Sequence, residues 1–271
     1  MGWTVLTAPA FQARVRRHFV ALGGTLQDLD DNGGATGDER HFCCSGFVVS
    51  IRGTWCLVTA GHVLLQIDNG VRSGRHRLLK FGLMDYFSTA AVVKEPTPFP
   101  YPSVHRIALD DDDVGYDFGI IPLGDLFRAS VAANGVLPIP VAAWDSRSPP
   151  RFDTYALLGM PVEEMVAVSR EGPRGPQIGH QVNLILAGVE PLSVAPPARV
   201  ASHVPRFAAW LRDGDELESV VGMSGGPIIG INPASREYAC IAIQGSWRSQ
   251  TRMVLGTPMG ILVDAINRLL D

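Results

Sequence analysis

The segment Gly222-Met223-Ser224-Gly225-Gly226-Pro227 has the residue types that a nucleophilic serine needs around it. Glycines on both sides allow a tight turn and let a substrate carbonyl approach the main chain closely. The N–H groups of Gly222 and Ser224 can then point at one spot, where negative charge develops on the carbonyl oxygen during acyl transfer. Because Gly/Ser turns without any chemical role are also common, this assignment depends on partners elsewhere in the chain.

Two further segments supply these partners. Thr59-Ala60-Gly61-His62 follows an apolar run, and Asp117 opens a second apolar run. A serine hydroxyl needs an imidazole that takes its proton and a carboxylate that orients the imidazole and stabilises its charged form. His62, Asp117 and Ser224 together can therefore carry out nucleophilic acyl transfer. Asp113 offers a second carboxylate, but the apolar strand that follows Asp117 favours Asp117.

The pattern Gly222-x-Ser224-x-Gly226 also fits the nucleophile elbow of α/β-hydrolases. In that fold the catalytic histidine follows the serine along the chain. All seven histidines of this chain precede Ser224, which excludes an esterase or lipase of that fold.

The elements that must position these residues are short β-strands. Apolar segments bounded by turn residues predict strands at 46–51, 55–59, 78–83, 89–94, 105–109, 118–123, 155–160, 165–169, 182–189, 227–231, 238–244 and 253–256. A proline-rich stretch at 134–151 separates two sets of about six strands, which predicts two antiparallel barrels. We therefore expect an all-β fold.

Helices are expected near both ends of the chain. The first covers residues 9–22 and precedes an acidic, glycine-rich loop at 28–39. At the other end, Thr257 can cap a helix that has Pro258 in its first turn and an apolar face. The predicted division is an N-terminal helix and acidic loop at 1–40, a first barrel with His62 and Asp117 at 41–133, a linker at 134–151, and a second barrel with Ser224 and the C-terminal helix at 152–271.

Composition excludes several classes of function. Of the 271 residues, 46% are hydrophobic and 18% charged, and the formal net charge is −4. These values describe a globular protein without a basic field for nucleic acid. No apolar run has the length of a transmembrane helix, and the N-terminus lacks a signal-peptide pattern. We therefore expect a cytoplasmic protein with no nucleic-acid or membrane partner, and the oligomeric state stays open.

Cysteine usage agrees with a reducing compartment. The four cysteines are too few and too unevenly spaced for a disulfide framework: Cys43, Cys44, Cys56 and Cys240. Neighbouring residues in a strand point to opposite faces, so a bond between Cys43 and Cys44 is not expected. We expect reduced, buried or half-buried cysteines rather than a metal site or a thiol nucleophile.

Taken together, the three motifs resemble those of trypsin-like (chymotrypsin-fold) serine proteases of the compact bacterial type. Residues 59–62 match the family's Thr-Ala-x-His, residues 117–123 match its Asp-x-x-x-x-x-Leu strand, and residues 222–227 match Gly-x-Ser-Gly-Gly-Pro. The order His, Asp, Ser is also the family's order, and the resemblance covers roughly residues 42–271. It implies two antiparallel six-stranded β-barrels of the chymotrypsin type and a C-terminal helix, to which the residue pattern at 9–22 adds an N-terminal helical extension.

The resemblance implies a serine endopeptidase that hydrolyses peptide bonds through an acyl-enzyme. His62 would act as general base and then general acid, with Asp117 orienting it, and Ser224 would be the nucleophile. The N–H groups of Gly222 and Ser224 would hold the oxyanion. Protein or peptide is the expected substrate, with no cofactor required. The alternative is a catalytically weak or inactive protease fold that acts as a binding or scaffold module.

The resemblance also bears on specificity. In trypsin-like enzymes the residue six positions before the serine lies at the floor of the primary pocket, which here is Glu218. A carboxylate there would favour Lys or Arg in the substrate, although Arg248 or Arg252 could reverse this preference. The pocket wall, where substrate backbone could pair, is expected at three residues: Ile243, Gln244 and Gly245.

Met223 departs from the family's secreted members. Those enzymes have an aspartate at this position, which binds a newly formed N-terminal ammonium group. A methionine cannot form that ion pair, so we expect no activation by N-terminal cleavage.

Residues 28–39 fit the calcium-loop pattern Asp-x-Asp-x-Asn-Gly-x5-Glu. Its oxygen ligands would come from five residues: Asp28, Asp30, Asn32, Gly34 and Glu39. An acidic linker without a bound ion has the same composition, and a strand rather than a helix is expected after Glu39. Both interpretations are kept, and Ca²⁺ is a hypothesis only.

Overall fold

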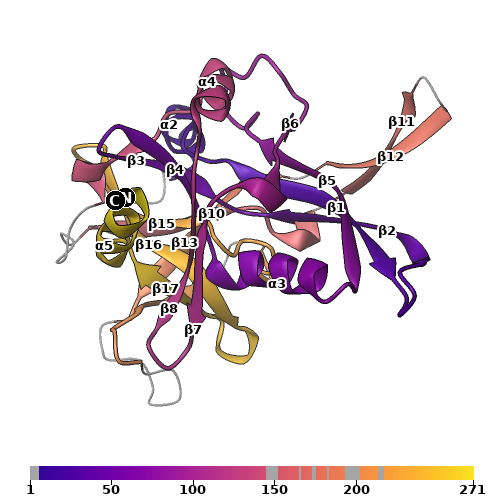
Figure 1. Cartoon of the computed structure of the whole chain (residues 1–271). Coiled ribbons are helices and arrows are strands. Elements are labelled where there is room, and N and C mark those ends of the chain that lie inside the picture. Colours follow the sequence, from indigo (N-terminus) through magenta and orange to yellow (C-terminus); the bar gives the residue numbers. More distant parts are fainter. Residues whose placement is uncertain are drawn as a thin grey trace.

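The computed structural model describes residues 6–144, 152–164, 166–172, 175–181, 183–192, 202–212 and 217–271. Within these ranges strands make up most of the regular structure, as the short apolar segments predict, and they form two halves of the molecule (Figure 1). None of the helices in these ranges is long and apolar enough to cross a membrane.

The hairpin predicted at 46–59 forms strands β3 (Phe47–Ile51) and β4 (Thr54–Thr59). Arg52 and Gly53 between them have φ angles of 49° and 81°, the positive values that a tight turn between antiparallel strands requires. This hairpin lies in a five-stranded sheet of order β7-β8-β4-β3-β9. The other strands of this sheet are β7 (Ile107–Asp111), β8 (Tyr116–Pro122) and β9 (Ile139–Pro140).

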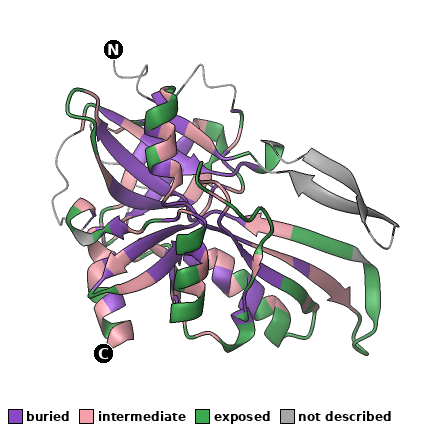
Figure 2. Ribbon diagram, turned by 90° about the horizontal axis from the view of Figure 1, so that it is seen from above, coloured by how far each residue is buried: buried purple, intermediate pink, exposed green. Residues whose placement is uncertain are grey.

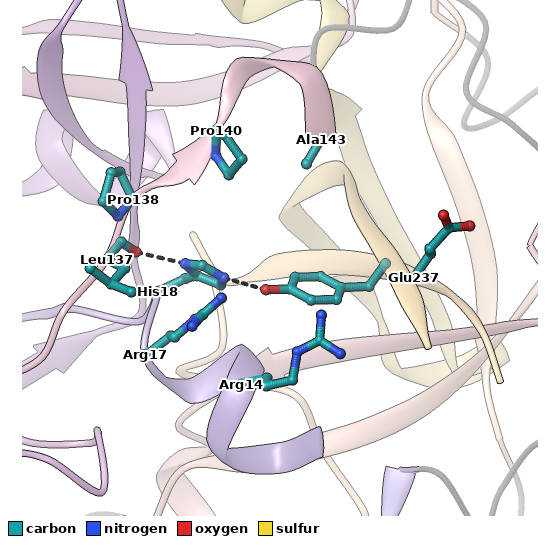
Figure 3. A pocket seen from close by; sticks show the side chains of 9 residues that line it. Arg14, Arg17, His18, Leu137, Pro138, Pro140, Ala143 and Glu237 are labelled. Atoms are coloured by element: carbon teal, nitrogen blue, oxygen red, sulfur yellow. Dashed lines mark hydrogen bonds between the residues drawn. The ribbon is translucent and has the colours of Figure 1, made fainter. Parts of the chain in front are cut away.

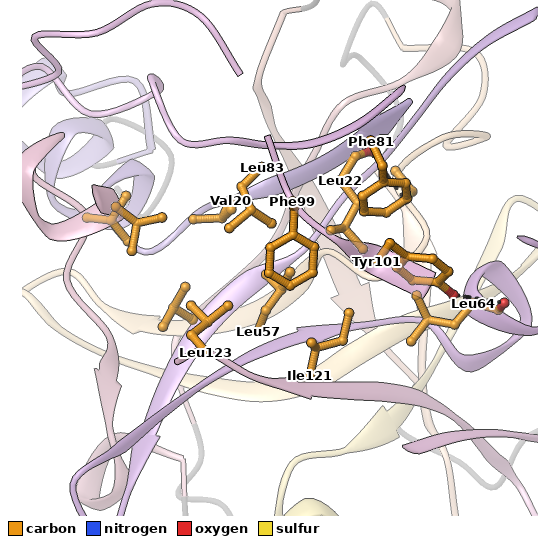
Figure 4. Close-up of a cluster of buried hydrophobic side chains, with 14 of the residues drawn as sticks. Val20, Leu22, Leu57, Leu64, Phe81, Leu83, Phe99, Tyr101, Ile121 and Leu123 are labelled. Atoms are coloured by element: carbon orange, nitrogen blue, oxygen red, sulfur yellow. Dashed lines mark hydrogen bonds between the residues drawn. The ribbon is translucent and has the colours of Figure 1, made fainter. Parts of the chain in front are cut away.

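A second sheet, of order β2-β1-β5-β6, completes the N-terminal half. Its strands are β1 (Ala21–Leu29), β2 (Ala35–Cys44), β5 (His76–Met84) and β6 (Thr97–Pro98). The two sheets share one apolar core, in which Leu22 and Leu83 of the second sheet and Leu57 of the first are fully buried (Figure 4). The half is therefore two packed sheets, and the closed first barrel that the sequence predicts is not confirmed.

The N-terminal segment differs from its prediction. The helix expected over 9–22 is shorter, α2 (Pro9–Arg16), and residues 21–29 continue as β1. Gly23-Gly24 does not end a helix but lies within this strand. A Cβ atom on Gly24 would stand 2.6 Å from the Phe42 ring of β2, so the glycine makes room for the neighbouring side chain. The acidic segment at 28–39 consequently covers the end of β1 and much of β2.

Other elements in this half were missed or misassigned. Helices α3 (Gly61–Arg72) and α4 (Asp125–Ala133) were not expected, and the predicted strand at 89–94 is irregular. Short 3₁₀ turns occur in both halves of the molecule: η1 (Tyr101–Ser103), η2 (Val141–Ala143), η3 (Val162–Glu164) and η5 (Ser249–Thr251).

The C-terminal half contains a closed six-stranded barrel, as the sequence predicts, in the order β10-β13-β14-β17-β16-β15, but β14 takes the place of the strand expected at 165–169. Its strands are β10 (Thr154–Gly159), β13 (Ile185–Pro191), β14 (Phe207–Leu211), β15 (Pro227–Asn232), β16 (Glu237–Arg248) and β17 (Met253–Pro258). A separate hairpin consists of β11 (Val166–Gly172) and β12 (Gly175–Gln181) and extends from the body of the molecule (Figure 1).

Helix α5 (Gly260–Leu270) is the predicted C-terminal helix and ties the halves together. Its Leu262 and Ile266 are fully buried against Phe47 of the first half, in a cluster that also contains Ile243 of the barrel. Buried residues gather where the two halves meet (Figure 2). The predicted domain boundaries at 40, 133 and 151 stay a prediction.

All four cysteines are free, and none is exposed. Burial raises the pKa of the Cys43 and Cys56 thiols to about 12, and the pKa values of Cys44 and Cys240 are raised as well. Such thiols are protonated at neutral pH and are poor nucleophiles. The cysteines occupy the buried and half-buried positions that were expected, and their reduced state stays a prediction.

Candidate active site

His62 and Asp117 form a two-point contact. His62 lies in the first turn of α3, directly after β4, and Asp117 lies near the start of β8. The ring Nδ1 of His62 is 2.7 Å from Asp117 Oδ2, and the His62 backbone N–H donates to Asp117 Oδ1 at 3.0 Å. Because a carboxylate accepts, Nδ1 carries the hydrogen and Nε2 is left with a free lone pair. This is the tautomer that a general base requires.

The barrel holds Asp117 in place. Thr257 Oγ1 on β17 accepts a hydrogen bond from the Asp117 N–H at 2.9 Å, and Thr257 is only 2% exposed. A Cβ on Gly245 of β16 would lie 2.5 Å from Asp117 Oδ2, so only glycine leaves room for the carboxylate. Thr257 was expected to cap the C-terminal helix, but α5 begins at Gly260 and Thr257 supports Asp117 instead.

Ser224 lies in the turn that precedes β15. The turn is closed by hydrogen bonds from Met223 N–H to the Val220 carbonyl (3.0 Å) and from Gly226 N–H to the Met223 carbonyl (2.9 Å). Met223 is fully buried in the barrel core, which agrees with the expectation that no ion pair forms at this position. The side chain of Met223 therefore anchors the turn and leaves the partly buried Ser224 at its surface.

Gly225 brings this turn against the residues that precede His62. Its φ angle is 89°, and a Cβ there would lie 2.2 Å from Thr59 Oγ1 and 2.7 Å from the Ala60 nitrogen. The serine turn thus contacts the end of β4 without an intervening side chain. Within the described residues, Ser224 Oγ forms no hydrogen bond with His62.

The two expected oxyanion donors are available. Gly222 has a φ angle of 92°, and in the described part of the chain neither the Gly222 N–H nor the Ser224 N–H has a hydrogen-bond partner. The N–H groups of Met223, Gly225 and Gly226 all have one. The turn therefore leaves unpaired the two donors that acyl transfer would use.

Ser45 fastens the serine turn to the other half of the molecule, and sequence reasoning missed it. This serine is fully buried between β2 and β3. Its Oγ donates to the Gly222 carbonyl at 3.1 Å and accepts from the Met160 N–H at 3.0 Å. Its own carbonyl accepts from Thr59 Oγ1 at 2.7 Å. The sequence around Ser45 carries no motif that could have identified it.

Electrostatics favour the charged form of His62. Burial of the ring disfavours the imidazolium, but the hydrogen bond and negative charge of Asp117, with smaller contributions from Asp110 and Asp112, raise the pKa of His62 above 6.5. Burial and the charge of Asp117 also raise the pKa of the Asp110 carboxyl. Asp112 forms an ion pair with Arg206 at 2.9 Å, so the acidic run at 110–113 is linked to the second half of the molecule.

The predicted specificity residues are not all brought together. Glu218 is exposed, and its carboxylate forms no hydrogen bond or ion pair with the described residues. The backbone N–H of Glu218 donates to Glu163 Oε1 at 3.0 Å. Ile243 and Gln244 are buried, and the barrel uses the Gln244 backbone, which bonds Gly225 and Gly226.

Beyond Gln244, strand β16 has a free edge. Pairing with β15 ends at Pro227↔Ile243, whereas pairing with β17 continues to Arg248↔Met253. Residues 245–248 therefore have no described strand partner on the β15 side. An extended chain can add to such an edge by backbone hydrogen bonds.

The predicted calcium loop spans the end of β1, a turn and the first part of β2, and two of its carboxylates already have protein partners. Asp28 Oδ1 pairs with Arg40 at 2.7 Å and with His76 at 2.8 Å. Asp30 Oδ1 accepts from the N–H groups of Asn32 (2.9 Å) and Gly34 (2.7 Å). In the described part of the chain no group of three or more His, Cys, Asp or Glu side chains could hold a metal ion. Calcium binding here stays a prediction without a formed ligand set.

No family model and no curated protein matches the sequence. Similar solved structures include AL20, a thermostable serine protease from an extremophilic microorganism, with 15% identity over 90% of this chain and 93% of that chain and a TM-score of 0.45. Protease Anisep from Arthrobacter nicotinovorans shares 14% identity over 92% and 93%, with a TM-score of 0.43. The murine norovirus NS6 protease shares 13% identity over 80% and 89%, with a TM-score of 0.38.

Proposed function

We propose that this protein is a trypsin-like serine endopeptidase. The observation that carries the proposal is the pairing of His62 Nδ1 with Asp117 beside a serine turn whose Gly222 and Ser224 N–H groups have no partner among the described residues. Each of these features is what nucleophilic acyl transfer needs, and they come from three distant parts of the chain.

In the proposed reaction His62 Nε2 takes the proton of Ser224 Oγ as this oxygen attacks the substrate carbonyl carbon. The carbonyl oxygen gains negative charge, which the Gly222 and Ser224 N–H groups stabilise. The imidazolium, stabilised by Asp117, then gives its proton to the leaving amine as the C–N bond breaks. Water, deprotonated by His62, attacks the acyl-enzyme, and the proton returns to Ser224 as the acid product leaves.

The free edge of β16 supports a peptide as the substrate. Gly245 lies against Asp117, and the preceding Gln244 bonds the serine turn, so a strand paired along residues 245–247 would run past the catalytic groups. Glu218 remains the proposed determinant of a preference for Lys or Arg. A cytoplasmic location is also proposed, on the composition of the chain alone.

The test is cleavage of a peptide library by the purified protein, analysed by mass spectrometry. We expect cleavage at defined bonds that Ser224→Ala lowers by about 10⁴-fold or more. Equal cleavage by wild type and Ser224→Ala would show that another group, or a contaminant, does the work.

A binding or scaffold module is the second candidate. The observation that favours it is the absence of a hydrogen bond between Ser224 and His62 in the described structure. Catalytic hydrogen bonds are often long before substrate binds, so this geometry does not exclude catalysis. Peptide binding at the β16 edge without turnover would support this candidate.

A further inference from the structure

A cavity of about 490 Å³ lies away from the candidate active site, between α2, the linker and the start of β16 (Figure 3). Its volume is within the roughly 300–1,000 Å³ of small-molecule sites. Tyr238, which lines it, is six residues along β16 from Gln244, a separation of roughly 20 Å in a strand. The cavity is therefore distinct from the serine turn.

One wall of the cavity is a neutral hydrogen-bonded chain. His18, only 3% exposed, has its Nδ1 at 2.6 Å from the Leu137 carbonyl and its Nε2 at 2.6 Å from the Tyr238 hydroxyl. The carbonyl can only accept, so Nδ1 carries the hydrogen and Tyr238 donates to Nε2. Burial lowers the pKa of His18 to about 4, and the ring is uncharged at neutral pH. His18 therefore links the Leu137 backbone to Tyr238 by hydrogen bonds and adds no charge to the cavity.

Two arginines line the cavity with unused donors. In the described structure the Arg17 side chain has no hydrogen bond or ion pair, and its Nε is buried without a partner. The Arg14 guanidinium lies over the Tyr238 ring, 5.2 Å from its centre, and among the described residues it donates only to the Arg236 carbonyl. The buried Nε of Arg17 cannot be reached from the cavity, but the two outer guanidinium nitrogens of Arg17 are not buried and have no partner in the described structure. An anion in the cavity would accept hydrogen bonds from these nitrogens.

The rest of the lining defines what the anion must be attached to. Leu137, Pro138, Pro140 and Ala143 form an apolar wall beside the arginines. Figure 3 shows Arg17 and Glu237 at opposite ends of the lining, so the Arg17 end of the cavity is positively charged. An inorganic anion would make no contact with the apolar wall, and a cation would be repelled by the two arginines.

We propose that this cavity binds a small organic carboxylate with an apolar body. Arg17 and Arg14 hold the carboxylate by charge-assisted hydrogen bonds, and the body packs on the linker prolines. Because α2, the linker and β16 all line the site, the ligand connects the N-terminal segment to the barrel.

The probe is octanoate, titrated into the full-length protein by calorimetry, with octylammonium and acetate as comparisons. We expect saturable octanoate binding that is at least tenfold tighter than that of either comparison. Arg17→Met keeps an unbranched apolar stem and removes the charge, and should weaken octanoate binding about tenfold or more. Arg72→Met, on the exposed face of α3, is the matched control and should leave binding unchanged.

Glu237→Gln provides a second, opposite test, because removing the negative charge should tighten octanoate binding. This variant keeps the proposal open to refutation if Arg17→Met fails to fold. Absence of octanoate binding at millimolar concentration would overturn the proposal, as would equal binding of octylammonium or unchanged affinity in Arg17→Met. None of these measurements depends on peptidase activity, so this proposal can fail while the proposed function stands.

Discussion

Replacing Ser45 by alanine removes one buried hydroxyl that serves both halves of the molecule. The substitution leaves the Gly222 carbonyl and the Met160 N–H without their partner. Met160 is 2% exposed, so its N–H cannot turn to water, and a buried group left unpaired costs about 1–3 kcal/mol. We expect Ser45→Ala to lower the free energy of unfolding by that amount.

The same change should affect catalysis more than binding. The Gly222 carbonyl lies between the two oxyanion donors along the chain, so its release loosens the turn that orients both N–H groups. Loss of one oxyanion donor costs about 10²–10³-fold in kcat; a loosened pair should cost less, about 10- to 100-fold, with a much smaller change in KM.

The assay combines denaturant unfolding with kcat and KM on a peptide substrate. Ser50→Ala, the same substitution on the adjacent strand β3, is the control and should change neither quantity appreciably. If Ser45→Ala lost stability as expected but kept its kcat, Ser45 would be a structural residue only, and the reasoning about the turn would be refuted.

Three other predictions follow from the site. Because the pKa of His62 is raised above 6.5, its imidazolium persists above pH 6.5 and cannot act as a base there. The ratio kcat/KM should therefore fall with decreasing pH, with an inflection above pH 6.5. An inflection below pH 6.5 in the pH–rate profile would contradict this prediction. Gly225→Ala should lower both the free energy of unfolding and the activity, since the new Cβ would lie 2.2 Å from Thr59 Oγ1. The control Gly53→Ala has a similar φ of 81° and open space around it, so it should cost only the backbone strain of roughly 1–3 kcal/mol. Equal losses of unfolding free energy in the two variants, compared by denaturant unfolding, would show that the clash at Gly225 is relieved. Glu218→Gln should lower the kcat/KM ratio of Arg- over Leu-containing peptides by about tenfold; an unchanged ratio would remove Glu218 from specificity.

The candidate triad residues could be selected from the sequence because each lies in a short motif next to a strand. The motifs at 59–62, 117–123 and 222–227 indicated His62, Asp117 and Ser224, and the structure joins the first two by a 2.7 Å contact. Alternating apolar residues indicated most strands of the barrel and the C-terminal helix. These signals are local, so a single sequence contains them.

The supporting residues could not be predicted, since their roles depend on contacts between distant segments. Ser45 meets Gly222 across 177 positions, and Thr257 meets Asp117 across 140. Glycine gave a misleading signal at Gly23-Gly24, which ends helices in many proteins but here makes room for Phe42 within a strand. The arrangement of the first half as two sheets was also beyond reach, because it depends on pairing between strand edges, which strand-by-strand patterns do not specify.

The central claim is that Ser224 is a nucleophile activated by His62, and covalent labelling tests it most directly. Purified protein is treated with a fluorophosphonate, and the adduct is measured by intact mass and mapped by peptide sequencing. The account predicts one adduct per chain on Ser224, absent in Ser224→Ala and formed far more slowly in His62→Ala. A folded wild-type protein that takes up no label, or takes it up at another residue, would contradict the account.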